Sequence, residues 1–394
     1  MIAVEEARAL ATEGLRPLAA ESVSLADALG RALADAVTAT RALPGFTNSA
    51  MDGYAVQHAS LTGGPLDVVM TLPAGVALGG AVGPGQAARI FTGAVLPPGA
   101  DTVVIQENTS REGDRVWVDE RPKPGANIRH AGSDVAVGHA LVRPGVELHP
   151  GLVAMLAAQG LRQIPVVRRP RVAILPNGDE LVPIDATLLP GQVPNTNAHM
   201  LAAQVLEAGG QPRVFPPIPD AADALTAVLQ EATASADLVL TTGGMSVGDF
   251  DFAREVLSVA GDLAFHKVRM KPGKPLGLGR IDGVPVLGLP GNPVSAFVGF
   301  ELFGRPMLRT LAGFTVVDRP QGEAPVASRI RRNRSRPEFV RCRVTAAGLV
   351  RHDNQSSGAL GSLVDVDVLA RIPPGPEPVE PGETVRYLDL RRSR

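Results

Sequence analysis

The stretch DLVLTTGGMSVGDFDFAREVLSV (237–259) decides the fold class of this chain. It predicts a short buried strand, a glycine-rich loop and an apolar helix, in that order. The same alternation is predicted on both sides of it, with strands at 171–175, 213–215 and 237–240 and helices at 198–208, 220–235 and 252–259. Short strands that alternate with helices indicate a doubly wound, mainly parallel α/β domain, which we expect over residues 169–315.

Three further domains are expected around it. Residues 1–43 with 146–168 predict a helical domain, because Leu25, Leu29 and Leu33 lie four apart behind Ser24, a candidate N-cap, and a second helix is expected at 148–162. Residues 44–145 show short apolar runs between Pro/Gly turns, which predicts a β-rich domain. Residues 316–394 show a similar pattern and predict a small C-terminal β domain. The whole is therefore a multidomain α/β protein.

Composition excludes several classes of protein. The 394 residues carry 38 basic and 40 acidic side chains, a net charge of −2, which argues against a chain that coats nucleic acid or an anionic membrane. The single cysteine, Cys342, excludes an internal disulfide and a cysteine-built zinc site, and its Arg-Cys-Arg setting favours a half-buried strand position over a nucleophile. No run is long enough to span a bilayer, and Glu5 and Glu6 stand where a secretory signal carries basic residues. We expect a cytoplasmic protein with no nucleic-acid or membrane partner.

Ligands of doubly wound sheets bind outside the carboxyl ends of the strands, which directs attention to the loops 176–181, 241–251 and 290–296. The loop 241–251 holds three glycines, hydroxyl side chains and two carboxylates, more than a tight strand-to-helix connection needs, although that structural reading stays open. It has neither the lysine of a P-loop nor the dinucleotide GxGxxG spacing. Its glycines and exposed amides would suit an anionic group.

Two more segments favour an anion. In LPGNPVSA (289–296), Ser295 and the nearby amides could hold an oxyanion, while Asn292 is equally well explained as an ordinary helix cap. In HKVRMKPGK (266–274), alternating Lys267, Arg269 and Lys271 would share one face of a strand with Lys274 just beyond the turn; an edge strand that carries basic residues against mispairing is the alternative. The ligand implied is a phosphate or another multiply charged oxyanion.

Five carboxylates form the complementary set: Asp52, Asp134, Glu180, Asp220 and Asp251. Each alone is explained as a cap or turn residue. If several of them converge, they would bind Mg²⁺, which takes oxygen ligands and commonly bridges substrate phosphates. The seven histidines show no metal-binding spacing.

Six segments in this order resemble the MoeA-type molybdopterin molybdenumtransferases, the family that includes the E domain of gephyrin. They are LPGFTNSAMDGYAV (43–56), TGAVLPPGADTVV (92–104), NIRHAGSDV (127–135), TTGGMSVGDFD (241–251), KPGKP (271–275) and LPGNPVSA (289–296). The resemblance runs from about residue 23 to 390. It implies that adenylylated molybdopterin and molybdate give molybdenum cofactor and AMP, assisted by Mg²⁺. It also implies a homodimer whose cleft lies between the sheet domain of one subunit and the β domain near Asp52 of the other.

The resemblance also assigns residues. Its catalytic positions fall on Asp52, Asp134, Glu180, Asp220 and Asp251, of which Asp52, Glu180 and Asp251 would hold the metal. Its substrate-binding positions fall on Thr92, Arg129, Thr242, Gly243, Gly244, Ser246, Lys271, Lys274, Pro275, Asn292 and Ser295. The segment RPEFVR (336–341) resembles the family's basic contribution to the molybdate site, with the choice between Arg336 and Arg341 open. QSSGAL (355–360) matches only loosely.

The chain departs from the family pattern at Asn177, Thr196 and Ser133, where a small hydroxylated residue, a serine and an acidic residue are usual. Because Asp134 and Glu180 are kept, we still expect activity, with altered affinity. Two other functions stay open: adenylyl transfer from ATP to molybdopterin, and a non-catalytic cofactor carrier or scaffold. The retained carboxylates Asp52, Asp134 and Asp251 favour an enzyme. Expected partners are the molybdopterin adenylyltransferase and the molybdoenzymes or maturation proteins that receive the cofactor.

Overall fold

The computed structural model describes residues 1–76, 79–243 and 262–391 and divides the chain into two compact units. Unit 1 comprises Met1–Asp35, Pro144–Pro150 and Gln163–Arg394, and unit 2 comprises Ala36–Arg143 and Gly151–Arg162. This division is coarser than the four expected domains, so their boundaries stay a prediction.

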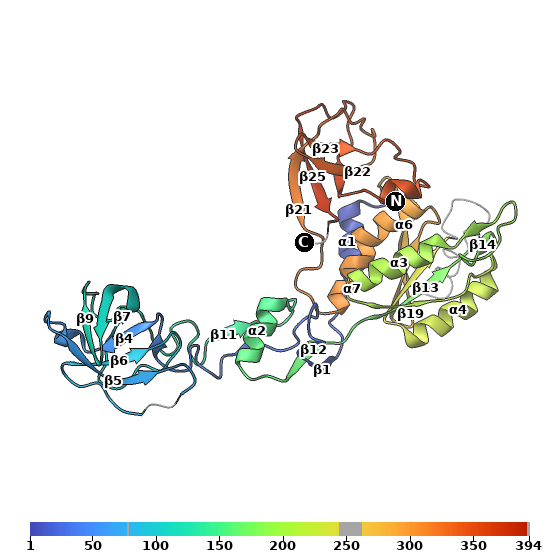
Figure 1. The fold of residues 1–394 in the computed structure, drawn as a ribbon. Coiled ribbons are helices and arrows are strands. Elements are labelled where there is room, and N and C mark those ends of the chain that lie inside the picture. The colour runs from blue at the N-terminus through green and yellow to red at the C-terminus, as the bar shows by residue number, and fades with distance from the viewer. Residues whose placement is uncertain (77–78, 244–261, 392–394) are drawn as a thin grey trace. The chain divides into compact units, whose positions relative to one another are not determined.

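The central sheet of unit 1, of which β13 and β19 are labelled in Figure 1, has six strands in the order β16-β13-β17-β20-β19-β18. Their bounds are β16 (Gln211–Val214), β13 (Arg171–Pro176), β17 (Leu238–Thr242), β20 (Val284–Leu289), β19 (Gly277–Ile281) and β18 (Asp262–His266). The first four run parallel, and β19 is antiparallel to both β20 and β18. This confirms the mainly parallel sheet that the sequence predicts.

Helices cover both faces of this sheet. On β13, Val172 and Ile174 share one core with Leu201 of α3 (Thr196–Glu207) and with α6 (Pro293–Gly299). The alternate residues Ala173 and Leu175 share a second core with Leu225 of α4 (Ala222–Ser235). Successive strand side chains point to opposite faces, so a strand buried on both sides is apolar throughout. The doubly wound arrangement is confirmed.

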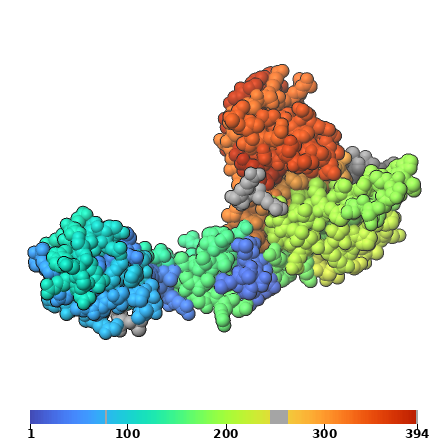
Figure 2. Space-filling view, viewed as in Figure 1, coloured from blue at the N-terminus to red at the C-terminus, as the bar shows by residue number. Residues whose placement is uncertain are grey.

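The C-terminal part of unit 1 is a five-stranded sheet in the order β21-β25-β24-β22-β23, with every neighbouring pair antiparallel. Its strands are β21 (Gln321–Pro325), β22 (Glu338–Thr345), β23 (Gly348–Arg351), β24 (Val368–Ile372) and β25 (Thr384–Asp389). Phe339, Leu369 and Leu388 share the core of the α/β part, and the two parts adjoin in Figure 2. Cys342 is fully buried in this sheet's own core, where burial raises the pKa of its thiol to about 12. Cys342 lies on a strand as predicted, but it is fully rather than half buried, and a nucleophile is not supported.

The remaining elements of unit 1 are short. They are α1 (Val4–Thr12), β1 (Ala20–Ser24), β12 (Gln163–Val167), β14 (Leu181–Val182), β15 (Val193–Pro194), η3 (Phe300–Gly304), α7 (Arg305–Leu311) and η4 (Leu360–Leu363). α6, η3 and α7 follow one another without a break. β1 pairs with β12, and β14 with β15.

Unit 2 is β-rich, as predicted. Its main sheet has the order β7-β4-β6-β5-β9-β8 and is antiparallel except for the β5–β6 pair. Its elements are β2 (Val37–Thr38), β3 (Asn48–Ser49), β4 (Gly53–Val56), η1 (His58–Ser60), β5 (Leu66–Leu72), β6 (Gln86–Ile90), β7 (Thr102–Ile105), η2 (Gln106–Asn108), β8 (Thr109–Glu112), β9 (Arg115–Val118), β10 (Ile128–Arg129), β11 (Ala140–Val142) and most of α2 (Pro150–Ala158).

The helix expected behind Ser24 is wrong, although the one expected at 148–162 forms as α2. Ser24 does cap a turn, since the Asp27 N–H donates to its hydroxyl oxygen at 3.3 Å, but Gly30 ends that turn with a φ of +70°. Leu29 is 52% exposed while Leu33 is buried and bridges to Val166. The spacing of Leu25, Leu29 and Leu33 therefore does not mark one buried helical face, because Leu33 pairs with the 163–167 segment instead of continuing a helix.

The basic strip 267–271 is also not a strand. β18 ends at His266, and Lys267 takes a φ of +69°, outside the range of an extended strand. Lys271 instead forms a bridge to Glu338 at the start of β22. The alternating cations consequently do not share a strand face. The helix expected at 252–259 lies outside the described residues.

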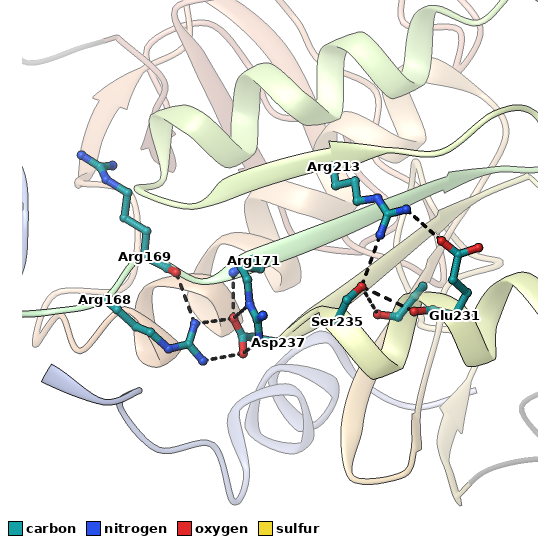
Figure 3. A network of polar contacts seen from close by, with 8 residues as sticks. Arg168, Arg169, Arg171, Arg213, Glu231, Ser235 and Asp237 are labelled. Carbon is teal, nitrogen blue, oxygen red and sulfur yellow. Dashed lines mark hydrogen bonds and ion pairs between the residues drawn. The ribbon is translucent and has the colours of Figure 1, made fainter. Parts of the chain in front are cut away.

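The starts of the parallel strands are tied together by Asp237, directly before β17. Both terminal nitrogens of Arg168 donate to its carboxylate at 2.7 Å, and the Arg171 N–H donates at 2.8 Å (Figure 3). A second, separate pair joins Arg213 and Glu231 at 2.8 Å. Both networks lie at the opposite end of the strands from the loops that were singled out above.

Candidate functional site

The carboxyl ends of β13, β17 and β20 meet at Gly243. The Asn177 N–H donates to the Thr242 carbonyl at 2.8 Å, and the Gly243 N–H donates to the Leu289 carbonyl at 3.2 Å. A Cβ on Gly243 would lie 2.0 Å from the Asn177 carbonyl oxygen, and its φ is +94°. Only glycine fits such a close approach in this conformation. Gly243 thus shapes the strand ends, whatever ligand lies beyond them.

Asn197, on the first turn of α3, links two of the loops. Its Nδ2 donates to the Thr242 hydroxyl at 2.9 Å and to the Gly291 carbonyl at 2.7 Å. Thr242 is buried, and its hydroxyl also approaches the Pro290 carbonyl at 3.4 Å. Thr242 therefore acts inside the scaffold of the site. The sequence interpretation did not single out Asn197, for which the polar segment 195–197 ahead of an apolar helix was the available signal.

A cavity of about 620 Å³ opens beside these loops. Its walls come from three regions far apart in the chain. The lining residues are 270–275, Pro290, Asn292, Ser295, Arg336, Arg351 and 355–357. Five of the expected substrate-binding residues are thereby brought together: Lys271, Lys274, Pro275, Asn292 and Ser295. Asn292 occupies the N-cap position of α6, as the cap interpretation expects, but its side chain makes no capping hydrogen bond there.

The cavity wall is rich in cations. The Lys271 ammonium lies 2.6 Å from the Glu338 carboxylate, and one Arg336 nitrogen approaches the Met270 carbonyl at 3.4 Å. The side chains of Lys274 and Arg351 have no hydrogen bond or ion pair with any residue of the described ranges. Unneutralised cations with a nearby hydroxyl, that of Ser295, suit a multiply charged oxyanion.

The two arginines left open by the sequence have different places. Arg336 lines the cavity. Arg341 is fully buried on β22, and its Nη2 donates to the carbonyls of Asn354 and Ser356 at 2.9 and 3.1 Å. The lining residues 355–357 and Arg351 were not among the expected site residues. For residues 355–357, the only signal in the sequence was the loose family match of the QSSGAL segment (355–360).

Carboxylates from two loops lie close together: Asp179 and Glu180 follow β13, and Asp220 precedes α4. The Asn177 Nδ2 donates to Asp220 Oδ1 at 2.5 Å, and the Asp220 N–H donates to Asp179 Oδ1 at 3.1 Å. Burial, together with the charges of Asp179 and Glu180, raises the pKa of Asp220 against the opposing effect of these hydrogen bonds. Concentrated negative charge of this kind favours a proton or a cation.

Unit 2 carries the second group of expected residues. Asp52, in the turn before β4, accepts hydrogen bonds from the Thr92 hydroxyl and N–H, both at 2.7 Å. These bonds, with a smaller contribution from Arg89, lower the pKa of Asp52. Arg129 lies on β10, which pairs with β3 just before Asp52, and Asp134 is exposed in the turn that follows.

Gly244, Ser246 and Asp251 lie outside the described residues. Asp52, Thr92, Arg129 and Asp134 belong to unit 2 and the other described candidates to unit 1, so the expected gathering of all carboxylates stays a prediction. Within residues 1–76, 79–243 and 262–391, no three His, Cys, Asp or Glu side chains gather as metal ligands. Over the same part of the chain, no helix has the length and apolarity to cross a bilayer.

Comparisons with known proteins cover almost the whole chain. Residues 2–160 match the MoeA N-terminal region (domain I and II), residues 173–310 a probable molybdopterin binding domain, and residues 323–390 the MoeA C-terminal region (domain IV). A molybdopterin molybdenumtransferase of Nostoc sp. is 39% identical over 94% of this chain and 88% of its own length. That of Bacillus subtilis is 35% identical over 94% and 90%. A solved molybdopterin biosynthesis MoeA protein of Pyrococcus horikoshii OT3 superposes with a TM-score of 0.87 at 30% identity, over 99% of this chain and 100% of that one.

Proposed function

The chain belongs to the MoeA family of molybdopterin molybdenumtransferases and inserts molybdenum into molybdopterin in molybdenum cofactor biosynthesis, and we propose that the pterin it accepts is adenylylated molybdopterin. Molybdate is the metal substrate. On this proposal the reaction yields molybdenum cofactor and AMP. The pterin dithiolene itself provides the metal's soft sulfur ligands, so a protein with one buried cysteine can perform the insertion.

The observation that carries the proposal is the cation-lined cavity. Lys271, Lys274 and Arg336 line it together with Ser295. Molybdate is a dianion with tetrahedral oxygens, and charge-assisted hydrogen bonds from ammonium and guanidinium groups would neutralise and orient it. The glycine-bounded strand ends lie next to this cavity through Pro290 and Gly291, where a phosphate-bearing pterin would approach.

The carboxylates supply the second half of the proposal. Cleaving the adenylyl phosphate requires charge stabilisation where negative charge develops. Asp52, Glu180 and Asp251 would hold Mg²⁺, which supplies that stabilisation when bound. The donors fit magnesium in kind, since all are carboxylate oxygens and Asp52 keeps Oδ2 free of hydrogen bonds to the described residues. Asp134 and Asp220 would orient the substrate and exchange protons. The proposal includes a cytoplasmic homodimer that receives its pterin from an adenylyltransferase and passes the cofactor to molybdoenzymes.

The test is to incubate the protein with adenylylated molybdopterin and to follow AMP by chromatography, with and without molybdate and Mg²⁺. AMP release that depends on both is expected. Asp251→Asn should abolish turnover while leaving pterin binding largely intact. Intact nucleotide after prolonged incubation contradicts the proposal and leaves the carrier or scaffold function. Incorporation of labelled ATP into molybdopterin would instead identify an adenylyltransferase.

A further inference from the structure

Arg341 is the largest fully buried side chain of the described residues. A buried guanidinium is normally paired with a carboxylate, because removing a charge from water is costly. Arg341 has no such partner in the described ranges, and its Nε and Nη1 make no hydrogen bond there. Burial, followed by the neighbouring Arg351, lowers its pKa to about 10, so the group stays charged at neutral pH. An unneutralised positive charge is therefore kept inside the C-terminal sheet.

The side-chain hydrogen bonds that Arg341 makes to the described residues all reach one loop. Its Nη2 donates to the Asn354 and Ser356 carbonyls. Its backbone N–H donates to the Gln355 side-chain oxygen at 3.1 Å, and the Gln355 Nε2 donates back to its carbonyl at 2.9 Å. The 354–356 segment is thus held at four points by one residue of β22.

This loop forms part of the cavity wall. Gln355, Ser356 and Ser357 line the cavity. The carbonyl of Ser357 also accepts a hydrogen bond from the Val294 N–H at 3.0 Å, directly beside Ser295 in the first turn of α6. Hydrogen bonds at both ends of the loop, joined by its backbone, consequently link Arg341 to the start of α6, where Ser295 lies.

We propose that Arg341 is a positioning residue of the oxyanion cavity: it fixes the 354–357 loop, and its unpaired charge raises the affinity for the dianion without touching it. A neutral amide could hold the same carbonyls without the cost of burying a charge, so fixing a loop does not by itself account for an arginine. Charges in a low-dielectric interior act over longer distances than charges in water. The inference rests on the proposed function, since the cavity must bind molybdate.

The experiment compares Arg341→Gln and Arg341→Lys with the wild type by titration calorimetry of molybdate on the full chain, at two salt concentrations. Arg343→Gln is the matched control, because Arg343 stands two residues further along β22, is 55% exposed and pairs with Asp365 at 3.5 Å. We expect Arg341→Gln to weaken molybdate binding roughly tenfold, about 1.4 kcal/mol. Arg341→Lys should recover part of the loss, and Arg343→Gln should match the wild type. The KM for the pterin substrate and kcat at saturating molybdate should stay within about twofold.

Two results overturn the inference alone: a folded Arg341→Gln protein that binds molybdate as tightly as the wild type, or an equal loss of molybdate and pterin affinity with a lower Tm, which would indicate a purely structural role. If Arg341→Gln does not fold, Arg341→Met, which also removes the charge, decides, and wild-type molybdate affinity in it then counts against the proposal. A wild-type protein that does not bind molybdate contradicts the proposed function, and the inference falls with it. If Arg336→Gln loses molybdate binding and Arg341→Gln keeps it, the proposed function stands and only the role of Arg341 is rejected.

Discussion

Thr92 donates two hydrogen bonds to a single oxygen of Asp52: its hydroxyl and its backbone N–H both lie 2.7 Å from Oδ1. The side-chain bond is the largest contribution to the lowered pKa of Asp52, followed by the backbone bond. Arg89 adds a smaller effect, and its guanidinium is held over Phe91 at 4.4 Å. One carboxylate oxygen is thereby fixed, while Oδ2 has no hydrogen bond to the described residues.

Replacing Thr92 by valine should move the acid side of the pH–activity profile. In the wild type the lowered pKa keeps Asp52 ionised to lower pH, and Thr92→Val removes the hydroxyl bond, so its pKa rises toward the ordinary value. Activity at acidic pH should fall while activity near neutrality changes little. The measurements are kcat/KM against pH and NMR titration of the Asp52 carboxyl. Thr109→Val is the control, since that hydroxyl donates to a carbonyl rather than a carboxylate; an unshifted acid limb in Thr92→Val would contradict a catalytic Asp52.

Lys271→Met should weaken molybdate binding by more than the removal of one positive charge explains, because it also leaves Glu338 without its partner. The side chain of Glu338 is only 12% exposed. Without Lys271, the Glu338 carboxylate would be an unpaired negative charge near the cavity and would repel molybdate. We expect the KM for molybdate to rise roughly 10- to 100-fold and the double variant Lys271→Met/Glu338→Gln to recover part of that. Steady-state kinetics at varied molybdate provide the test.

Lys274→Met serves as the comparison, because Lys274 has no carboxylate partner in the described residues. Glu338→Gln should bring no recovery in the Lys274→Met background. Equal recovery in both backgrounds would mean that the Lys271–Glu338 pair has no specific effect on molybdate.

Gly243→Ala should unfold or strongly destabilise unit 1. The added Cβ would meet the Asn177 carbonyl oxygen at 2.0 Å in a conformation with φ of +94°. Gly283→Ala has a comparable φ of +80° but open space, so it should cost only about 1–2 kcal/mol in the free energy of unfolding. Denaturant unfolding should therefore show a loss in Gly243→Ala that exceeds the control by several kcal/mol. Similar losses in both variants would show that backbone conformation, rather than the close approach of β13 and β17, requires this glycine.

The sequence predicted those parts of the fold that local pattern determines. The runs at 171–175 and 237–240 correspond to β13 and β17. A strand that is buried on both faces is apolar along its length, so its own sequence is enough to identify it. Leu29 and Leu33 were misassigned because their spacing is equally compatible with a turn followed by strand bridging, a contact with residues more than a hundred positions away.

The cavity could be predicted only through the family resemblance. Lys271, Ser295 and Arg336 come from different segments, and no periodicity within any one of them indicates that they share a wall. The positive φ of Lys267, which removes the expected strand face, accompanies two hydrogen bonds with distant Ile2: the Ile2 N–H donates to the Lys267 carbonyl at 3.1 Å, and the Arg269 N–H donates to the Ile2 carbonyl at 2.8 Å. The buried, unpaired state of Arg341 was equally inaccessible, since Arg341 and Arg343 lie on the same face of β22 and only packing by other segments decides which of them is covered.

Asp237 offers a stability test independent of the chemistry. Burial alone would raise its pKa, but the hydrogen bonds from Arg168 and Arg171 outweigh this and lower the pKa from 3.8 to about 2. Because the folded-state pKa is lowered, the carboxylate stabilises the folded state above its unfolded pKa, and that stabilisation is lost as the pH falls from about 4 toward 2.

Asp237→Asn should therefore cost about 2 kcal/mol in the free energy of unfolding at pH 7, with a deficit relative to the wild type that shrinks as the pH approaches 2. Urea unfolding at several pH values measures it. Glu231→Gln breaks the neighbouring Arg213 pair, whose side chains are both 59% exposed, and should cost less than about 0.5 kcal/mol at any pH (Figure 3). A deficit in Asp237→Asn that persists unchanged at acidic pH would show that packing, rather than the ionised carboxylate, joins Arg168 to the start of β17.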